Sequence, residues 1–158
     1  MAIDTHIKFT GVDGEATHKD HKGEIEVLSW GWGVVNQSQT VGGGSGKGKA
    51  EPMAFHLTKL YCKASPVMAK KCAQGVHFDT VTMTCRKSGE GQKDFLKVTM
   101  KEAYITSISP SGSSGGDIIE SVQMTYGWID FDYKAQDEKG GMGGGVLFKW
   151  DVKKSDFP

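Results

Sequence analysis

The sequence predicts a mainly β protein, a partly open antiparallel β-barrel of two packed sheets with one short α-helix. Three observations lead to this fold class. Apolar and polar residues alternate at both ends of the chain, four further segments are rich in Val, Ile, Thr and aromatic residues, and one segment carries helix signals. The chain has 158 residues, enough for one domain with a real core, so residues 1–158 are predicted to form a single β-barrel domain.

The two terminal strands show the alternation most clearly. One face of the first strand carries Ile3, Thr5, Ile7 and Phe9, and one face of the last strand carries Val146, Phe148, Trp150 and Val152. Most of the residues between them are polar. A period of two with one apolar face is typical of a strand that is buried on one side. Both ends are therefore predicted to be half-buried strands.

Further strands are predicted over residues 53–61, 78–86, 95–109 and 118–133. Because strand follows strand, the sheet is predicted to be mostly antiparallel. The apolar phase shifts by one residue between Val27 and Leu28, and again between Trp128 and Ile129. Such shifts occur where a strand carries a bulge or passes from one sheet to another, as in small barrels. A closed or nearly closed barrel follows.

Residues 22–34 alternate large apolar side chains with very small ones. In an extended strand one face carries Leu28, Trp30, Trp32 and Val34, and the other carries Ser29, Gly31 and Gly33. Glycine weakens a strand interior, so the bare face indicates that another group approaches closely there, or that the strand bends. This pattern favours the wall of an assembly or lumen over an active site.

One segment is predicted to be helical, and it is short. Ser65 is a good N-cap, Pro66 fits the first helical position, Met68 and Cys72 are four residues apart, and Gly75 fits the end. We expect this helix to cover one open end of the barrel.

Composition excludes several classes of function. The chain has 19 Lys and Arg against 19 Asp and Glu, so no basic surface for nucleic acid or an anionic membrane is predicted. It contains no apolar run of roughly 18 residues and no basic-then-apolar N-terminal signal, so we expect synthesis in the cytoplasm without membrane insertion. The three cysteines, Cys62, Cys72 and Cys85, are an odd number and are predicted to be small buried thiols, with neither a disulfide nor a zinc site.

Two segments imitate ligand sites. Residues 43–50 resemble a phosphate-binding loop, but Ala50 replaces the hydroxyl that would hold magnesium and Pro52 follows where a helix should run, so a flexible loop is favoured. A polar segment between two predicted strands contains Asp13, Glu15, His18, Asp20 and His21. These side chains could ligate a metal or act as acid and base, but solvated surface residues are the favoured interpretation.

No catalytic residue, cofactor or metal site is predicted, and the chain is not expected to be an enzyme. Asp130 and Asp132 share one strand face, as glycosidase chemistry could use, but surface or interface charge is the favoured interpretation. The G-x-S-x-G elbow of a hydrolase is missing. The four tryptophans would form a sugar-binding platform if exposed, and core positions are favoured. A monomeric β-barrel carbohydrate-binding module and a small hydrolase remain the alternatives.

The run EIEVLSWGWG over residues 24–33, preceded by IKFTGVDGEAT over residues 7–17, resembles the haemolysin-coregulated protein (Hcp) family of bacterial type VI secretion. The resemblance continues through residues 57–59, 65–68 and 101–109 and ends in the strand at residues 118–133. It implies hexameric rings that stack into the inner tube, are ejected by sheath contraction and carry small effector proteins in the lumen. The implied partners are other copies of the chain, a spike protein at the tube tip, the contractile sheath and effectors.

The resemblance also implies roles for particular residues. It places Ser29, Gly31 and Gly33 on the lumen and effector-facing surface, and Leu28, Trp30 and Trp32 in the barrel core. The ring-stacking loop that it implies consists of Gly42, Gly43, Gly44, Ser45, Gly46, Lys47, Gly48 and Lys49. Assembly in the cytoplasm and secretion without a cleaved signal peptide complete the expectation.

Overall fold

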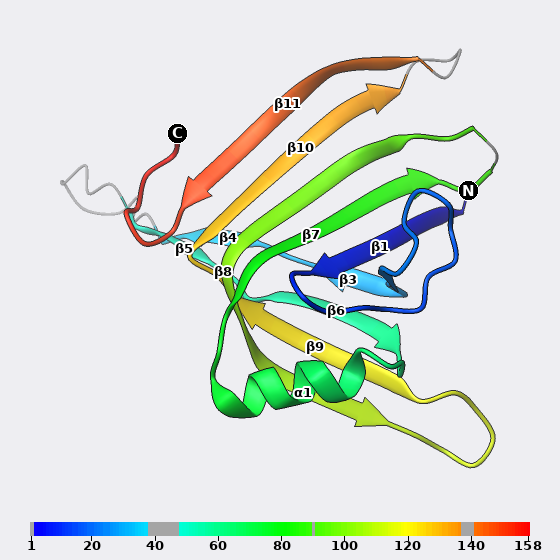
Figure 1. Ribbon diagram of the computed structural model, residues 1–158. Coiled ribbons are helices and arrows are strands. Elements are labelled where there is room, and N and C mark those ends of the chain that lie inside the picture. Colours follow the sequence, from blue (N-terminus) through cyan, green and yellow to red (C-terminus); the bar gives the residue numbers. More distant parts are fainter. Residues whose placement is uncertain (1, 38–47, 90, 137–140) are drawn as a thin grey trace.

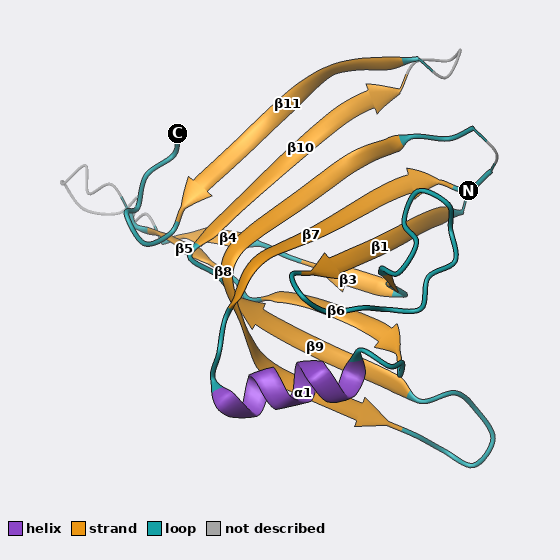
Figure 2. Ribbon diagram, in the orientation of Figure 1, coloured by secondary structure: helices purple, strands orange, loops and turns teal. Residues whose placement is uncertain are grey.

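The computed structural model describes residues 2–37, 48–89, 91–136 and 141–158, and most of them lie in strands (Figures 1 and 2). The strands are β1 (Ile3–Phe9), β2 (Ile25–Glu26), β3 (Ser29–Gly31), β4 (Val34–Asn36), β5 (Ala50–Pro52), β6 (Phe55–Leu60), β7 (Phe78–Lys87), β8 (Asp94–Ser111), β9 (Ile119–Thr125), β10 (Trp128–Gln136) and β11 (Met142–Asp151). The helix α1 (Ser65–Gln74) lies between β6 and β7. The predicted mainly β fold is confirmed.

The long strand β8 joins two antiparallel sheets (Figure 1). Its first part pairs with β7 and β10, and the first sheet runs β2, β1, β7, β8, β10, β11. Its last part pairs with β9, and the second sheet runs β8, β9, β6, β3. Pairing with β7 ends at Ala103 and pairing with β9 begins at Tyr104, and the register against β9 shifts just after this passage, between Ile105 and Ser107. The result is the predicted partly open barrel of two packed sheets.

Both predicted phase shifts mark passages between the sheets. The Val27 N–H donates to Thr5 of β1, whereas the next residue, Leu28, donates to Thr58 of β6. At the second shift the strand predicted over residues 118–133 is two strands, because β9 ends at Thr125 in the second sheet and β10 begins at Trp128 in the first. Each shift therefore exchanges the face that the chain turns toward the core.

The core lies between the two sheets. Its largest fully buried apolar side chains are Ile7, Phe9, Phe55, Leu57, Met68, Val81, Met83, Met100, Met124 and Ile129. The prediction of a half-buried last strand is wrong for its first part: Trp150 is buried, but Val146 is 70% exposed. The reason is that β11 is an edge strand of the first sheet, and among the described residues it pairs with β10 alone.

The helix ends as predicted but begins differently. The Gly75 φ angle is +67°, and its N–H and that of Val76 donate to Cys72 and Lys71 at 3.1 and 3.2 Å, a left-handed helix end. Ser65 is not the N-cap, which is Ala64. The Ser65 hydroxyl instead accepts hydrogen bonds from Lys59 Nζ at 2.8 Å and from the Cys62 N–H at 3.0 Å.

The helix packs against β8 (Figure 2). Its Met68 side chain is buried. Cys85 is a buried free thiol as predicted, whereas Cys62 and Cys72 are free but half-buried. Within the ranges that the structure describes, no helix is both long and apolar enough to span a membrane.

Candidate functional site: an uncharged sheet face

The outer face of the second sheet carries mainly uncharged polar residues, and exposed Leu60 and Ile119 form its last row. Side chains alternate along its strands, so that Leu57, Val122 and Met124 point into the core and their neighbours point outward. We call these outward residues the neutral face: Ser29, Gly31, His56, Thr58, Ser107, Ser109, Ser121 and Gln123. None of these eight is Lys, Arg, Asp or Glu.

Strand register arranges the neutral face in rows. Ser29, Thr58, Ser121 and Ser109 lie opposite one another across β3, β6, β9 and β8, and the Ser29 and Thr58 hydroxyls are 2.6 Å apart. Gly31, His56, Gln123 and Ser107 form the adjacent row. Hydroxyl and amide groups of this kind can form hydrogen bonds with water or with the surface of another molecule, and they carry no charge.

The glycines of this segment are covered by their own neighbours. A Cβ at Gly31 would collide with the His56 imidazole, and one at Gly33 would lie 2.8 Å from Met53 Sδ. The sequence predicts that another group approaches these glycines closely, and the groups that do so are His56 and Met53 of the same chain. Gly31 is not bare toward solvent, because the exposed His56 ring lies over it. Ser29 and Gly31 belong to β3, and Gly33 follows that strand.

The opposite face of the same segment reaches the core only in part. Trp30 stacks on Phe55 with ring centroids 5.8 Å apart, and Trp32 packs on Phe131 at 4.9 Å. Leu28 is 55% exposed, so its predicted core position is wrong. The cause is the passage between sheets, because Leu28 is the first residue bound to β6. Val34 is likewise exposed, since it begins the separate β4–β5 pair.

The Trp32 indole is held by a buried tyrosine. Trp32 Nε1 donates to the Tyr126 hydroxyl, which in turn donates to the Met53 carbonyl at 2.7 Å. Burial raises the pKa of Tyr126, and the Trp32 hydrogen bond opposes this increase. Trp30, Trp32 and Trp128 are half-buried and Trp150 is buried. The tryptophans therefore form no exposed sugar platform.

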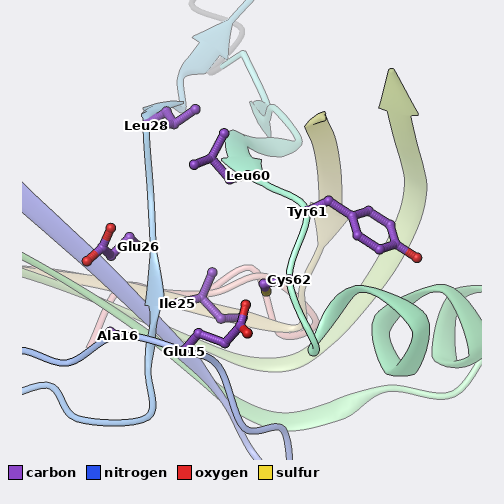
Figure 3. A pocket seen from close by; sticks show the side chains of 8 residues that line it. All are labelled: Glu15, Ala16, Ile25, Glu26, Leu28, Leu60, Tyr61 and Cys62. Carbon is purple, nitrogen blue, oxygen red and sulfur yellow. The ribbon is translucent and has the colours of Figure 1, made fainter. Parts of the chain in front are cut away.

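A small pocket lies between the segment that joins β1 to β2 and the end of β6 (Figure 3). It has a volume of about 200 Å³ and is lined by Glu15, Ala16, Ile25, Glu26, Leu28, Leu60, Tyr61 and Cys62. In Figure 3 the Tyr61 ring points away from the other lining side chains. The pocket combines an apolar wall with two carboxylates, and it is large enough for one side chain rather than for a cofactor.

The outer face of the first sheet has the opposite character. Charged side chains lie among threonines on it, and we call the following residues the charged face: Lys8, Lys97, Lys101, Asp130, Asp132 and Lys149. Lys8 and Lys149 are at the ends of one row, which passes through Thr82, Thr99 and Asp130. Asp130 Oδ2 also accepts a hydrogen bond from Trp128 Nε1 at 2.8 Å. Asp130 and Asp132 lie beside Lys149 and Lys97 and are half-buried, and their interpretation as surface or interface charge stays a prediction.

The polar segment between β1 and β2 differs from its prediction. Asp13, Glu15 and Asp20 are exposed, but His21 is 6% exposed and contacts Glu24, Arg86 and Asp94. The solvated interpretation is therefore wrong for His21. No three His, Cys, Asp or Glu side chains are arranged to hold a metal within the four described ranges.

The ring-stacking loop falls mostly outside the described residues. Gly42, Gly43, Gly44, Ser45, Gly46 and Lys47 lie there, and their assignment stays a prediction. The flexible loop predicted over residues 43–50 lies mostly there too, but its last residue, Ala50, belongs to β5. Of the remaining two residues of the ring-stacking loop, Gly48 accepts a hydrogen bond from Asn36 Nδ2 at 3.2 Å, and Lys49 is exposed.

Comparisons with known proteins agree across the whole chain. The family described as "Type VI secretion system effector, Hcp" matches residues 6–133. Protein hcp1 of Pseudomonas aeruginosa is 36% identical over 159 residues, which cover 98% of each protein. The crystal structure of Hcp1 from Salmonella typhimurium is 32% identical with a TM-score of 0.84 and complete coverage of both chains. A structure titled as a type six secretion system protein reaches a TM-score of 0.93 at 29% identity, covering 99% of this chain and 100% of that one.

Proposed function

This chain belongs to the Hcp family of type VI secretion proteins, and from that premise we propose that it is a structural subunit of the inner tube. In this proposal six copies close into a ring, rings stack into a tube, sheath contraction ejects the tube, and small effector proteins travel in its lumen. The observation that carries the proposal is the contrast between the neutral and charged faces of one barrel. A tube subunit needs two such surfaces, one for the lumen and one for the outside of the tube.

We assign the neutral face to the lumen. A cargo that must enter and later leave needs contacts that are weak and not fixed in register, whereas charged patches steer partners and fix their register. Rows of hydroxyl and amide groups meet that need. The assignment includes Ser29 and Gly31 of the neutral face, and we extend it to Gly33, which follows β3. The charged face would then turn outward, where the sheath surrounds the tube. The spike protein would cap the tube end.

Ring closure would also use the exposed edge of the first sheet. The β11 strand leaves backbone groups and apolar side chains open, including Val146 and Leu147, which are 70% and 56% exposed. Exposed edges of this kind favour pairing with another chain, and closed rings remove them. A formal net charge of zero adds no repulsion between copies. We further propose assembly in the cytoplasm and release without a cleaved signal peptide.

The first prediction is that the purified protein has six times the mass of the 17.1 kDa chain. Val146→Lys should lower that mass while leaving the melting temperature nearly unchanged, because the side chain is exposed in the single chain but would be covered in the ring. Light scattering coupled to size-exclusion chromatography measures the molar mass of the parent and of Val146→Lys. Val67→Lys, at an exposed valine of α1, is the matched control and should keep the parental mass. If the parental protein is a monomer at micromolar concentration, the tube proposal is wrong.

The second prediction concerns the lumen assignment. Ser121→Arg, at the centre of the neutral face, should keep ring mass and change the stability by no more than about 0.5 kcal/mol, because the site is exposed. It should weaken or strengthen the capture of an effector encoded beside the gene by several-fold. Thr99→Arg, at the centre of the charged face, should leave capture unchanged. Equal effects of both variants would contradict the lumen assignment, while an intact parental ring would leave the tube proposal standing.

A further inference from the structure

Three imidazoles gather where residues 11–24 fold back over the outer face of the first sheet. His6 projects outward from β1, yet it is only 4% exposed, because His18 and His21 of this segment cover it. The His6 and His21 rings are stacked, with centroids 4.8 Å apart and planes 10° apart. The His18 centroid lies 5.7 Å from that of His6 and 5.8 Å from that of His21. The described residues offer no hydrogen-bond partner to His6 Nδ1.

Hydrogen bonds around His21 fit the neutral imidazole. Its Nδ1 lies 2.6 Å from Glu24 Oε2, so Nδ1 carries the hydrogen. Its Nε2 lies 3.1 Å from Arg86 Nη2, and a guanidinium can only donate. Nε2 therefore accepts from Arg86. A proton on Nε2 would lie against the Arg86 cation, although Asp94 Oδ1 is also 3.2 Å from Nε2.

The charges around His6 determine how readily its ring takes up a proton. The acidic groups facing it are Glu24 and Glu26, together with Asp94 of β8 and Asp20, both of which pair with Arg86 of β7. Glu24, Asp20 and Asp94 are already engaged by His21 and Arg86. A positive charge on His6, stacked 4.8 Å from His21 and shielded from water, has no such contact. His6 in the closed segment therefore takes up a proton less readily than a solvated imidazole does.

We propose that the His6, His18 and His21 stack is an acid-sensitive latch: near neutral pH it holds residues 11–24 on β1 and β7, and acidification releases this segment while the barrel stays folded. Burial is the main cause that lowers the pKa of His6 in the closed state, and repulsion from His21, wherever His21 is protonated, acts in the same direction; Glu24 and Glu26 act in the opposite direction. A lowered pKa means that the closed state is fully favoured above the ordinary histidine value of about 6.5 and loses ground as the pH falls below it.

Release would remove a wall from two pockets. The segment supplies Glu15 and Ala16 to the pocket of Figure 3, and Thr17 and His18 to a second pocket of about 310 Å³ beside it. Both pockets also include Leu28, directly before the neutral face. Anything held there at neutral pH would lose part of its contact surface in acid. The latch depends on one chain alone and does not require the ring.

Hydrogen exchange measured by mass spectrometry tests the latch. The reporting amides are Gly14, Ala16 and Gly23, which donate to Gly23, Glu24 and Ala16 at 2.7, 2.9 and 2.9 Å within the segment. After correction for intrinsic exchange, their protection should fall about tenfold between about pH 7.5 and about pH 5.5. Protection in β7 and β8 should not change. Equal protection of the segment at both pH values would overturn the latch.

A matched pair of variants identifies the titrating group. His6→Phe keeps a flat ring in the stack, loses no observed Nδ1 hydrogen bond and cannot take up a proton, so it should retain protection in acid. His77→Phe changes an exposed histidine outside the stack and should lose protection as the parent does. Acid release that is as large in His6→Phe as in the parent would refute the role of the stack. If His6→Phe does not fold, imidazole NMR of the parent decides: titration of His6 at its ordinary value would refute the latch.

Discussion

Lys59→Met is expected to destabilise the protein by about 3 to 5 kcal/mol, because it leaves a buried carboxylate without its cation. Lys59 Nζ lies 2.8 Å from Glu120 Oε1, and the two side chains are 0% and 2% exposed. The ammonium also donates to the Ser65 hydroxyl at 2.8 Å and to the Leu60 carbonyl at 3.1 Å. It thereby ties β6 and β9 to the start of α1. Denaturant unfolding followed by tryptophan fluorescence measures the loss.

A double variant separates the effect of the unpaired charge on stability from the effect of changed side-chain packing. Lys59→Met with Glu120→Leu removes both charges and should recover most of the lost stability, since apolar replacements of buried pairs are often neutral. Lys153→Met is the control on the surface: it breaks the exposed pair with Glu102 and should have little effect. If Lys59→Met alone unfolds at the parental denaturant concentration, Glu120 has reached water and the pair is not structural.

Phe55→Ala is expected to cost about 3 to 5 kcal/mol, which is typical of deleting a buried aromatic ring. Phe55 is fully buried, lies opposite Met124 of β9, and carries the Trp30 ring stacked on it. A loss of this size should lower the melting temperature by roughly 10 °C in a chain of this length. Calorimetry or circular dichroism measures the change.

Two comparisons make the Phe55 result interpretable. Trp30→Ala removes the other ring of the same stack, and it should cost less because Trp30 is half-buried. Phe157→Ala removes a ring that is 56% exposed, although it stacks on Trp150 at 5.3 Å, and should cost the least. An order in which Trp30→Ala exceeds Phe55→Ala would mean that the core is centred nearer β3 than we describe.

Much of the fold could be predicted because its signals are local. The alternation of Ile3, Thr5, Ile7 and Phe9 predicts the bounds of β1, and Gly75 predicts the end of α1 through a backbone angle that glycine adopts readily. The phase shifts at Val27 and at Trp128 predict the passages between the sheets, since a side chain cannot change faces within a regular strand. The exposure of Val146 could not be predicted, because it follows from the place of β11 at the edge of the first sheet.

The candidate site was only partly predictable for the same reason. Ser29 and Gly31 stand out by their contrast with Trp30, but the rest of the neutral face comes from β6, β8 and β9, which register alone brings into line with β3. The collision between a Gly31 Cβ and His56 is a property of two strands, and neither strand predicts it by itself.

The sequence by itself determined the mainly β fold class, the helix end and the points where the chain changes sheets, because these depend on side-chain period and backbone angles within a few residues. Only the tertiary structure decided that Leu28 is exposed, that His21 stacks on His6, and that Lys59 meets Glu120. The physical reason is that burial and charge pairing arise between segments distant in the chain. Their partners are set by strand register and by how the two sheets close over the core.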